Sequence, residues 1–153
     1  PIHEAPFAGH AIVGCAWLIH KTKNQSIEYL TCAAGRIKTW IEGSRTWIRA
    51  NLEMMPPWRY EELKISQDVE HVSSKKAHTF VWAWIDKEKG IVRARTFAPD
   101  WGIPEDEANG SGSMKLSATL GRKLEIHHGK GSLIYAAPWR AKWADVGGSV
   151  VED

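Results

Sequence analysis

Two short apolar segments stand out in the pattern of hydrophobic positions; Gly9 precedes the first, and Gly110 opens the second. They cover residues 10–21 and 110–121. In the first, apolar residues occupy most of the helix circumference, which is typical of a central, buried helix. The second ends with Gly121, a residue typical of a helix C-terminal cap. The pattern therefore predicts one buried helix in each half of the chain.

Short alternating segments separated by turn residues follow both helices. The predicted strands cover residues 26–33, 36–41, 45–50, 79–86, 91–97, 123–128, 131–137, 141–146 and 149–152. Residues 79–86 and 91–97 form a hairpin candidate, a long loop covers 98–109, and the polar stretch 58–77 is predicted to be a connector with a short helix at 67–72. Because few helices lie between strands, the order favours an α+β fold over a doubly wound parallel sheet.

One pattern occurs twice: a loop with proline and acidic residues, a glycine, an apolar helix and a run of strands. Gly9-His10 aligns with Gly110-Ser111, and Trp47 aligns with Trp143. We therefore expect two pseudo-symmetric halves, each a curled, mostly antiparallel sheet around a central helix, with one site between them. The predicted divisions are an N-terminal half at 1–57, a connector at 58–77 and a C-terminal half at 78–153. No strand precedes the first loop, so we expect the first half to be incomplete.

Composition narrows the class of protein. The chain has 153 residues and a formal net charge of +2, without a basic stripe, which argues against nucleic acid as the main partner. Nine tryptophans are unusual for this length; the alternation of Trp82 and Trp84 favours core packing over ligand stacking. The two cysteines, Cys15 and Cys32, predict reduced thiols in a cytoplasmic protein. We recognise no signal peptide and no apolar run long enough to cross a membrane.

The candidate chemistry lies at the two helix starts. The first turn of a helix offers free N–H groups and a positive dipole end, and Gly9 and Gly110 would let an anionic group approach them. The alternative is that these glycines serve only tight turns. His10 and Asp106 are the candidate proton-transfer groups, Asp106 within the acidic segment 105–107. We expect no metal, because the adjacent His127 and His128 point to opposite faces of a strand.

At PFAGHAIVG and FAPDWGIPEDEANGSG the chain resembles the PhzF-like isomerase and epimerase family of phenazine biosynthesis, which shares the diaminopimelate epimerase fold. The family pattern runs roughly PFxGHxTxGxA and FxPxxGxxEDxATGSAxxxL. The resemblance implies an active site between two halves, cofactor-independent proton transfer on a small carboxylate-bearing substrate, and a homodimer. By this resemblance Gly9 and His10 contact substrate, Asp106 transfers a proton or orients substrate, and Gly110 and Ser111 hold the carboxylate.

The chain also departs from that family. The principal proton-moving glutamate of the family lies upstream of the GH motif, and this sequence begins after that point. Asn109, Ser113 and Ile12 replace the usual Thr, Ala and Thr, and neither helix start carries the paired cysteines of the epimerases.

Three hypotheses therefore remain open. The first is an isomerase without metal or cofactor, whose main base comes from a further N-terminal segment. The second is a catalytically silent homologue or fragment that lacks the catalytic Glu but binds small carboxylates. The third is an incomplete chain whose uncovered helix and open sheet edges lead to aggregation or tight dimerisation.

Overall fold

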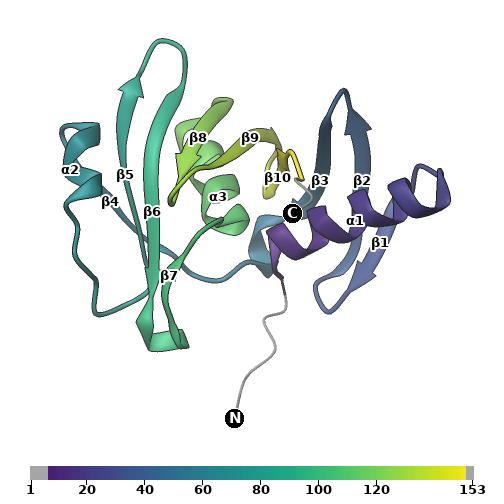
Figure 1. Ribbon diagram of the computed structural model, residues 1–153, viewed down its shortest axis with the longest axis horizontal. Coiled ribbons are helices and arrows are strands. Elements are labelled where there is room, and N and C mark those ends of the chain that lie inside the picture. The colour runs from purple at the N-terminus through teal and green to yellow at the C-terminus, as the bar shows by residue number, and fades with distance from the viewer. Residues whose placement is uncertain (1–6, 151–153) are drawn as a thin grey trace.

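The computed structural model describes residues 7–150, whose strands form one mixed sheet (Figure 1). The ten strands are β1 (Tyr29–Cys32), β2 (Gly35–Glu42), β3 (Arg45–Asn51), β4 (Arg59–Glu62), β5 (Thr79–Asp86), β6 (Ile91–Ala98), β7 (Ile103–Asp106), β8 (Leu124–His128), β9 (Ser132–Arg140) and β10 (Trp143–Gly148). Their order is β1-β2-β3-β10-β9-β8-β6-β5-β4, and β7 pairs with β6 beside this path. The pairs β4–β5 and β6–β8 are parallel.

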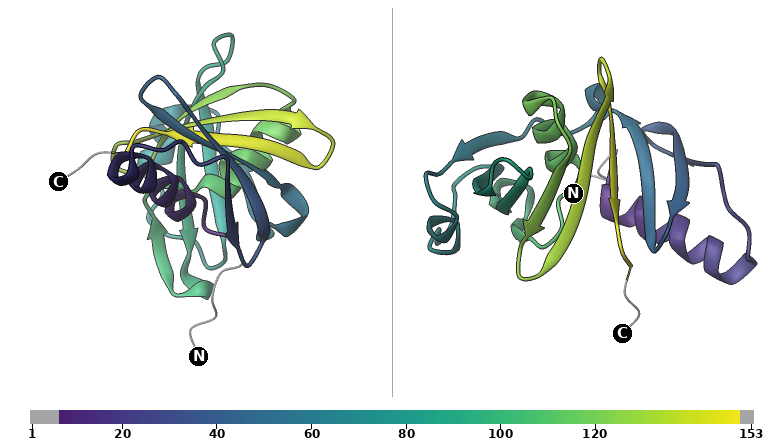
Figure 2. Two further views of the ribbon diagram at one scale, coloured as in Figure 1. Left: turned by 90° about the vertical axis from the view of Figure 1, so that its right-hand side faces the viewer. Right: turned by 90° about the horizontal axis from the view of Figure 1, so that it is seen from above.

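Three α-helices accompany the sheet: α1 (Gly9–Lys23), α2 (Ser66–Glu70) and α3 (Gly110–Leu120). Two single-turn helices, η1 (Leu52–Met54) and η2 (Pro99–Trp101), lie in loops. Seen from above, β9 and β10 lie between α1 and α3 (Figure 2). The two predicted long helices, the short helix and the α+β class are confirmed. The left-handed residue Gly121 ends α3 as the sequence predicts.

Buried side chains from both long helices and one face of the sheet form a single hydrophobic cluster. On α1 the cluster includes Ile12 and Val13, and on α3 it includes Met114 and Leu116. Alternate strand residues form its sheet side: Ile37, Ile48, Ala50, Phe80, Trp82, Val92, Ala94, Leu124, Ile126, Ile134, Ala136, Ala144 and Val146; Phe7 and Met55 add to it from loops. The expectation that Trp82 packs in the core is confirmed, since it is 4% exposed. The opposite sheet face therefore carries the other set of alternate residues.

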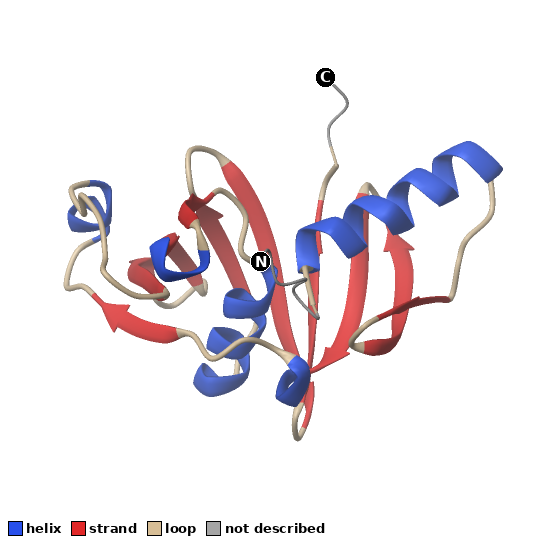
Figure 3. Ribbon diagram, turned by 90° about the horizontal axis from the view of Figure 1, so that it is seen from below, coloured by secondary structure: helices blue, strands red, loops and turns tan. Residues whose placement is uncertain are grey.

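The expectation that the first helix is buried all round is wrong. Only Gly9, Ile12, Val13 and Ala16 of α1 are buried, while Leu18 is 51% exposed. Among the described residues, β2, β3, β10 and the start of α3 pack on this helix, and they cover one side of it (Figure 3). An apolar circumference shows what a helix could bury, but burial also requires elements on every side.

The expectation of two separately curled sheets also needs correction. Strand β10, from the predicted C-terminal half, pairs with β3 from the N-terminal half, so the strands join into one sheet. The predicted connector contains β4, which pairs with β5, and the predicted long loop contains η2 and β7. The last predicted strand, 149–152, is not formed at 149–150, and residues 151–153 lie outside the described part of the chain.

An ion pair crosses the β3–β10 junction. The Arg49 Nε and Nη2 groups donate to the two carboxylate oxygens of Asp145 at 2.6 and 2.8 Å. Both side chains are largely buried, with 18% and 12% exposure. Because both donors and both acceptors are matched in a bidentate pair, the junction is held by side chains as well as by the backbone ladder.

Replacing Asp145 with Ala should lower the free energy of unfolding by about 2–3 kcal/mol, because Arg49 would keep its charge and lose its two acceptors. Urea denaturation measures the loss. The double variant Arg49→Met/Asp145→Leu should regain much of it, since no unpaired charge is left. Glu53→Gln, which breaks the exposed pair with Lys142, serves as control and should leave the urea midpoint unchanged. Equal midpoints for Asp145→Ala and Glu53→Gln would contradict the assignment.

Candidate functional site

The backbones of the two helix starts are in direct contact. A Cβ atom placed on Gly9 would lie 3.2 Å from the Cα of Gly110, and one placed on Gly110 would lie 3.3 Å from the Cα of Gly9. These distances are tighter than most real Cβ contacts, so a side chain at either position would push the two helix starts apart by a few tenths of an ångström. The structure thus brings together the two helix starts that the repeated sequence pattern singled out.

A cavity of about 460 Å³ opens beside this contact. Its walls come from both helix starts and from the adjoining ends of β9 and β10: Gly9, His10, Val13, Gly14, Ala108, Gly110, Gly131, Ser132, Leu133, Ile134, Tyr135, Val146, Gly147, Gly148, Ser149 and Val150. The volume is in the range of small-molecule sites. His10, which is exposed, supplies the imidazole of this cavity. Three predicted site residues, Gly9, His10 and Gly110, therefore line one cavity.

The two helix starts differ in how their N–H groups are satisfied. At α3, the Asn109 side-chain oxygen accepts the Gly112 N–H at 2.6 Å and so caps the helix. At α1, the N-cap residue Ala8 makes no side-chain cap bond. Within residues 7–150 no side chain accepts these first-turn N–H groups of α1, which are the kind of donors that bind an anion.

Asp106 supports the start of α3 and does not line the cavity. Its two carboxylate oxygens accept the Ala108 N–H at 3.2 Å and the Asn109 side-chain N–H at 3.0 Å. This second bond turns the amide oxygen of Asn109 toward Gly112. Asp106 therefore acts on α3 through Asn109, a residue that the sequence marked only as a departure from the family pattern.

Ser111 is also held by a protein partner. Its side chain is buried, and its hydroxyl oxygen accepts the indole N–H of Trp58 at 2.8 Å. Trp58 lies between η1 and β4, in the stretch predicted as a connector. Sequence reasoning missed Trp58, because no local pattern indicates that the segment returns to the start of α3. The backbone of Ser111 remains at the helix start, while its hydroxyl faces Trp58.

The neighbouring glutamates have structural partners of their own. Glu105 forms a bidentate pair with Arg95 at 2.7 and 2.9 Å, and this hydrogen bond to the guanidinium lowers the pKa of Glu105. Glu107 accepts the Lys130 N–H and the Ser132 hydroxyl in the β8–β9 turn. Partial burial raises the pKa of Glu107, but these donors outweigh it and leave the pKa below its ordinary value. The acidic segment is thus tied down rather than freely solvated.

His128 links the same loop to the sheet. The side chain is buried; its Nδ1 bonds to the Glu107 carbonyl oxygen at 2.7 Å and its Nε2 to the Thr96 hydroxyl at 2.8 Å. Burial lowers the pKa of His128, which favours the neutral imidazole. His127 is exposed and bonds to Glu125, so the two histidines do point to opposite faces. Within residues 7–150 no group of three or more His, Cys, Asp and Glu side chains is placed to hold a metal ion.

Comparison with solved structures identifies the architecture. A phenazine biosynthesis PhzC/PhzF protein of Clostridium difficile (strain 630) superposes with a TM-score of 0.74, over 95% of this chain and 71% of that one, at 15% identity. The chain has the PhzF-family fold. A phenazine biosynthesis PhzF-family protein of Enterococcus faecalis matches with a TM-score of 0.71, over 94% of this chain and 70% of that one, at 14% identity.

At this level of identity, the similarity establishes the PhzF-like fold and leaves the chemistry to the residues of this chain. No protein-family model matches the sequence. Across the described residues, none of the helices has the length and apolar character needed to span a bilayer.

Asn109→Ala should lower the free energy of unfolding by about 1–2 kcal/mol, because Gly112 loses its cap and Asp106 loses a donor. Asn109→Thr should retain most of the stability, since a threonine hydroxyl can also cap a helix. Thermal and urea unfolding of both variants check this expectation. Equal losses for Ala and Thr would contradict the capping role.

The Glu107 contact should be sensitive to pH. Because folding lowers the pKa of Glu107, its stabilising effect is present at neutral pH and disappears as the pH falls through the folded-state pKa, below the ordinary value near ~4.3. Glu107→Gln should therefore lower the urea midpoint at pH 7, and the difference from wild type should shrink as the pH approaches ~3. A difference that stays constant with pH would show that the carboxylate charge contributes nothing.

Proposed function

We propose that the chain carries the carboxylate-binding site of a cofactor-independent isomerase similar to PhzF proteins. The supporting observation is the contact between Gly9 and Gly110, which places two helix N-termini at one cavity. Each N-terminus attracts negative charge through its dipole and its N–H groups, and two of them together suit a small carboxylate. Gly9, Gly110 and Ser111 would bind this group through their backbone N–H donors.

In this proposal His10 transfers a proton to or from the substrate carbon, because an imidazole at the cavity wall can both accept and donate protons. In this candidate Asp106 orients the substrate indirectly, by holding Asn109 and the start of α3, because its carboxylate does not line the cavity. The reaction moves a proton between two positions of one molecule, so it consumes no redox cofactor. A cytoplasmic homodimer, with two pseudo-symmetric halves around the site, belongs to the same proposal. The two similar proteins are named for phenazine biosynthesis; for this chain we propose only a small carboxylate-bearing substrate.

A second candidate function is binding of such a carboxylate without turnover. The position of Asp106 favours this candidate, because both of its oxygens already accept hydrogen bonds and the residue does not line the cavity. A carboxylate used in this way positions α3 and has no direct access to a bound ligand. The two candidates share the binding site and differ in whether a proton is exchanged.

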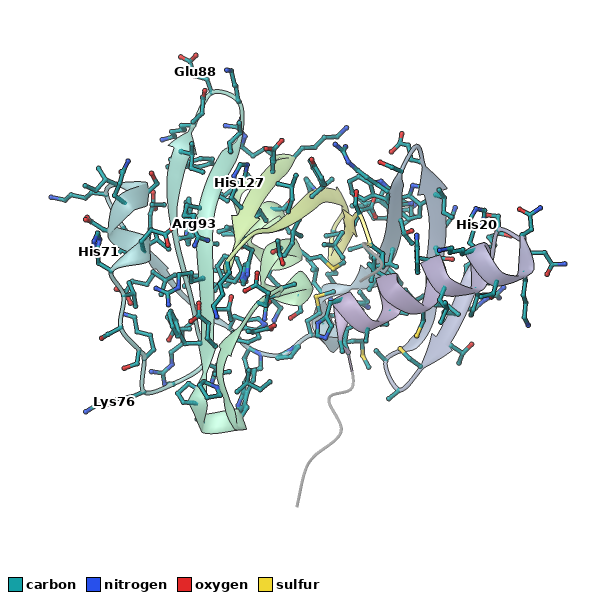
Figure 4. All side chains as sticks on the ribbon, viewed as in Figure 1. His20, His71, Lys76, Glu88, Arg93 and His127 are labelled. Carbon is teal, nitrogen blue, oxygen red and sulfur yellow. The ribbon has the colours of Figure 1, made fainter. Side chains whose placement is uncertain are left out.

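Isothermal titration with benzoate and unsaturated cyclic carboxylates tests the shared site. Gly9→Val should abolish binding, because its side chain would force the two helix starts apart. His20→Ala alters the other histidine of α1, far from the helix start (Figure 4), and should leave affinity unchanged. Absence of carboxylate binding by the wild type, or normal binding by Gly9→Val, would overturn the proposed site.

Deuterium uptake from D₂O into the bound ligand, followed by NMR, separates the two candidates. For an isomerase, Asp106→Ala should abolish turnover and His10→Ala should slow the exchange by about 100-fold while retaining binding. Binding without exchange in the wild type would support the silent homologue. Turnover near the wild-type rate in Asp106→Ala would refute the role given to Asp106.

A further inference from the structure

One face of β1, β2, β3, β10 and β9 carries aromatic rings and arginines in place of a hydrophobic layer. It is the face opposite the buried residues of these strands, as the cross-strand register shows: Trp40 pairs with Trp47, Trp47 with Gly147, and Gly147 with Tyr135. We call this surface the arginine–tryptophan face. Its aromatic members are Tyr29, Trp40, Trp47, Tyr135, Trp139 and Trp143, and its basic members are Arg36, Lys38, Arg45, Arg49 and Arg140.

The rings on this face are already stacked. Two guanidinium groups, from Arg49 and Arg140, lie 3.8 and 3.5 Å from the centroid of Trp139. At these distances they must occupy opposite sides of the ring, because two groups cannot share one side. Trp40 and Trp47 stack on each other with centroids 6.0 Å apart and planes at 6°. Both flat sides of Trp139 are therefore taken by guanidinium groups, and Trp40 and Trp47 contact each other in an offset stack.

Arginines also stack on the two tyrosines of the face. Arg36 lies 3.8 Å over the ring of Tyr29, and Arg45 lies 3.6 Å over the ring of Tyr135. Stacking covers the plane of a guanidinium and leaves its edge, with the N–H donors, free for an oxygen acceptor. Stacking also fixes these long side chains, which reduces the conformational entropy lost when a partner binds.

The charge on this face is unbalanced. Arg49 is neutralised by Asp145, but Arg36, Lys38, Arg45 and Arg140 have no ion-pair partner among the described residues. Glu42, opposite Arg45 in the β2–β3 register, is the acidic residue that remains on the face. A second copy presenting the same face would bring cations against cations, so a partner of complementary charge fits better.

We propose that the arginine–tryptophan face binds an extended acidic segment of another polypeptide. Carboxylates match the fork of N–H donors on a guanidinium edge. In an extended chain, alternate side chains lie about 6.6 Å apart on one side, which is also the spacing of Arg36 and Lys38 on β2. Single-stranded nucleic acid is the less suitable polyanion, because its bases need free ring faces for stacking, and a guanidinium already covers at least one face of Tyr29, Tyr135 and Trp139.

Fluorescence anisotropy of a labelled oligoglutamate peptide tests this proposal on the whole chain. The wild type should bind at low salt, with an affinity that falls as salt is added. Arg45→Gln/Arg140→Gln should weaken binding by about tenfold, because two guanidinium edges are lost. Lys76→Gln/Lys87→Gln removes the same charge outside this face, with Lys76 at the far end of the molecule (Figure 4), and should change affinity by less than about twofold.

Circular dichroism and urea unfolding establish that each variant is folded. If the Gln variant is not, Arg45→Lys/Arg140→Lys keeps the charge and removes the planar fork, and it should still weaken binding. Failure of the wild type to bind oligoglutamate at low salt, or equal losses in the face and control variants, would overturn the proposal. Tighter, face-dependent binding of an oligothymidylate of equal charge would overturn it in favour of nucleic acid. The carboxylate titration with Gly9→Val uses a separate ligand and variant, so failure of one proposal can be distinguished from failure of the other.

Discussion

The contact between Gly9 and Gly110 fixes how the two helix starts lie relative to each other at the cavity. Two helices that meet at their N-termini bring two positive dipole ends together, an arrangement that is electrostatically unfavourable unless negative charge or hydrogen-bond acceptors compensate for it. At the N-terminus of α3, the amide oxygen of Asn109 compensates for the positive dipole end, and Asp106 holds this amide in place. In the part of the chain that the structure describes, the N-terminus of α1 has no equivalent side-chain cap. The electrostatic demand for an anion is therefore concentrated at α1, next to His10.

The segment from the end of β7 to the start of α3 shows how this arrangement is kept rigid. Its three consecutive acidic residues have three different partners: Arg95 on β6, Asn109 at the helix cap and the β8–β9 turn. His128 fixes the loop backbone from a fourth direction, through the carbonyl of Glu107. A loop held in this way can oppose the repulsion between the helix ends without a bound ligand. The acidic segment is therefore a structural element first, whatever its role in proton transfer.

The sequence predicted the features that depend on local pattern. The two long helices, most strands and the pairing of the glycine motifs follow from periodicity and repetition. Strand β4 was missed because Arg59–Glu62 is an edge segment with mostly exposed side chains, so no alternation marks it. The single sheet was missed because the β3–β10 pairing joins residues about a hundred positions apart, which no local signal reports.

The positions of the tryptophans also depend on strand pairings that local sequence does not report. Core packing was the natural expectation for Trp82, and the structure confirms it. Trp40, Trp47 and Trp139 instead stack with one another or with arginines on the outer face, in contacts that depend on the cross-strand register. At the site, the glycines were visible as motifs, but the link from Asp106 through Asn109 to α3 depends on the conformation of one loop.

Asn109 shows why a shared fold does not settle the chemistry. The PhzF-like architecture fixes where the two helices begin, and it is retained at 15% identity. At the position of Asn109, the family pattern has threonine, whose hydroxyl could cap the helix but offers no amide N–H to the carboxylate. In this chain the amide caps α3 with its oxygen and binds Asp106 with its nitrogen, so one side chain performs both tasks. The backbone geometry can thus be preserved while a single substitution changes how available the neighbouring carboxylate is to a substrate.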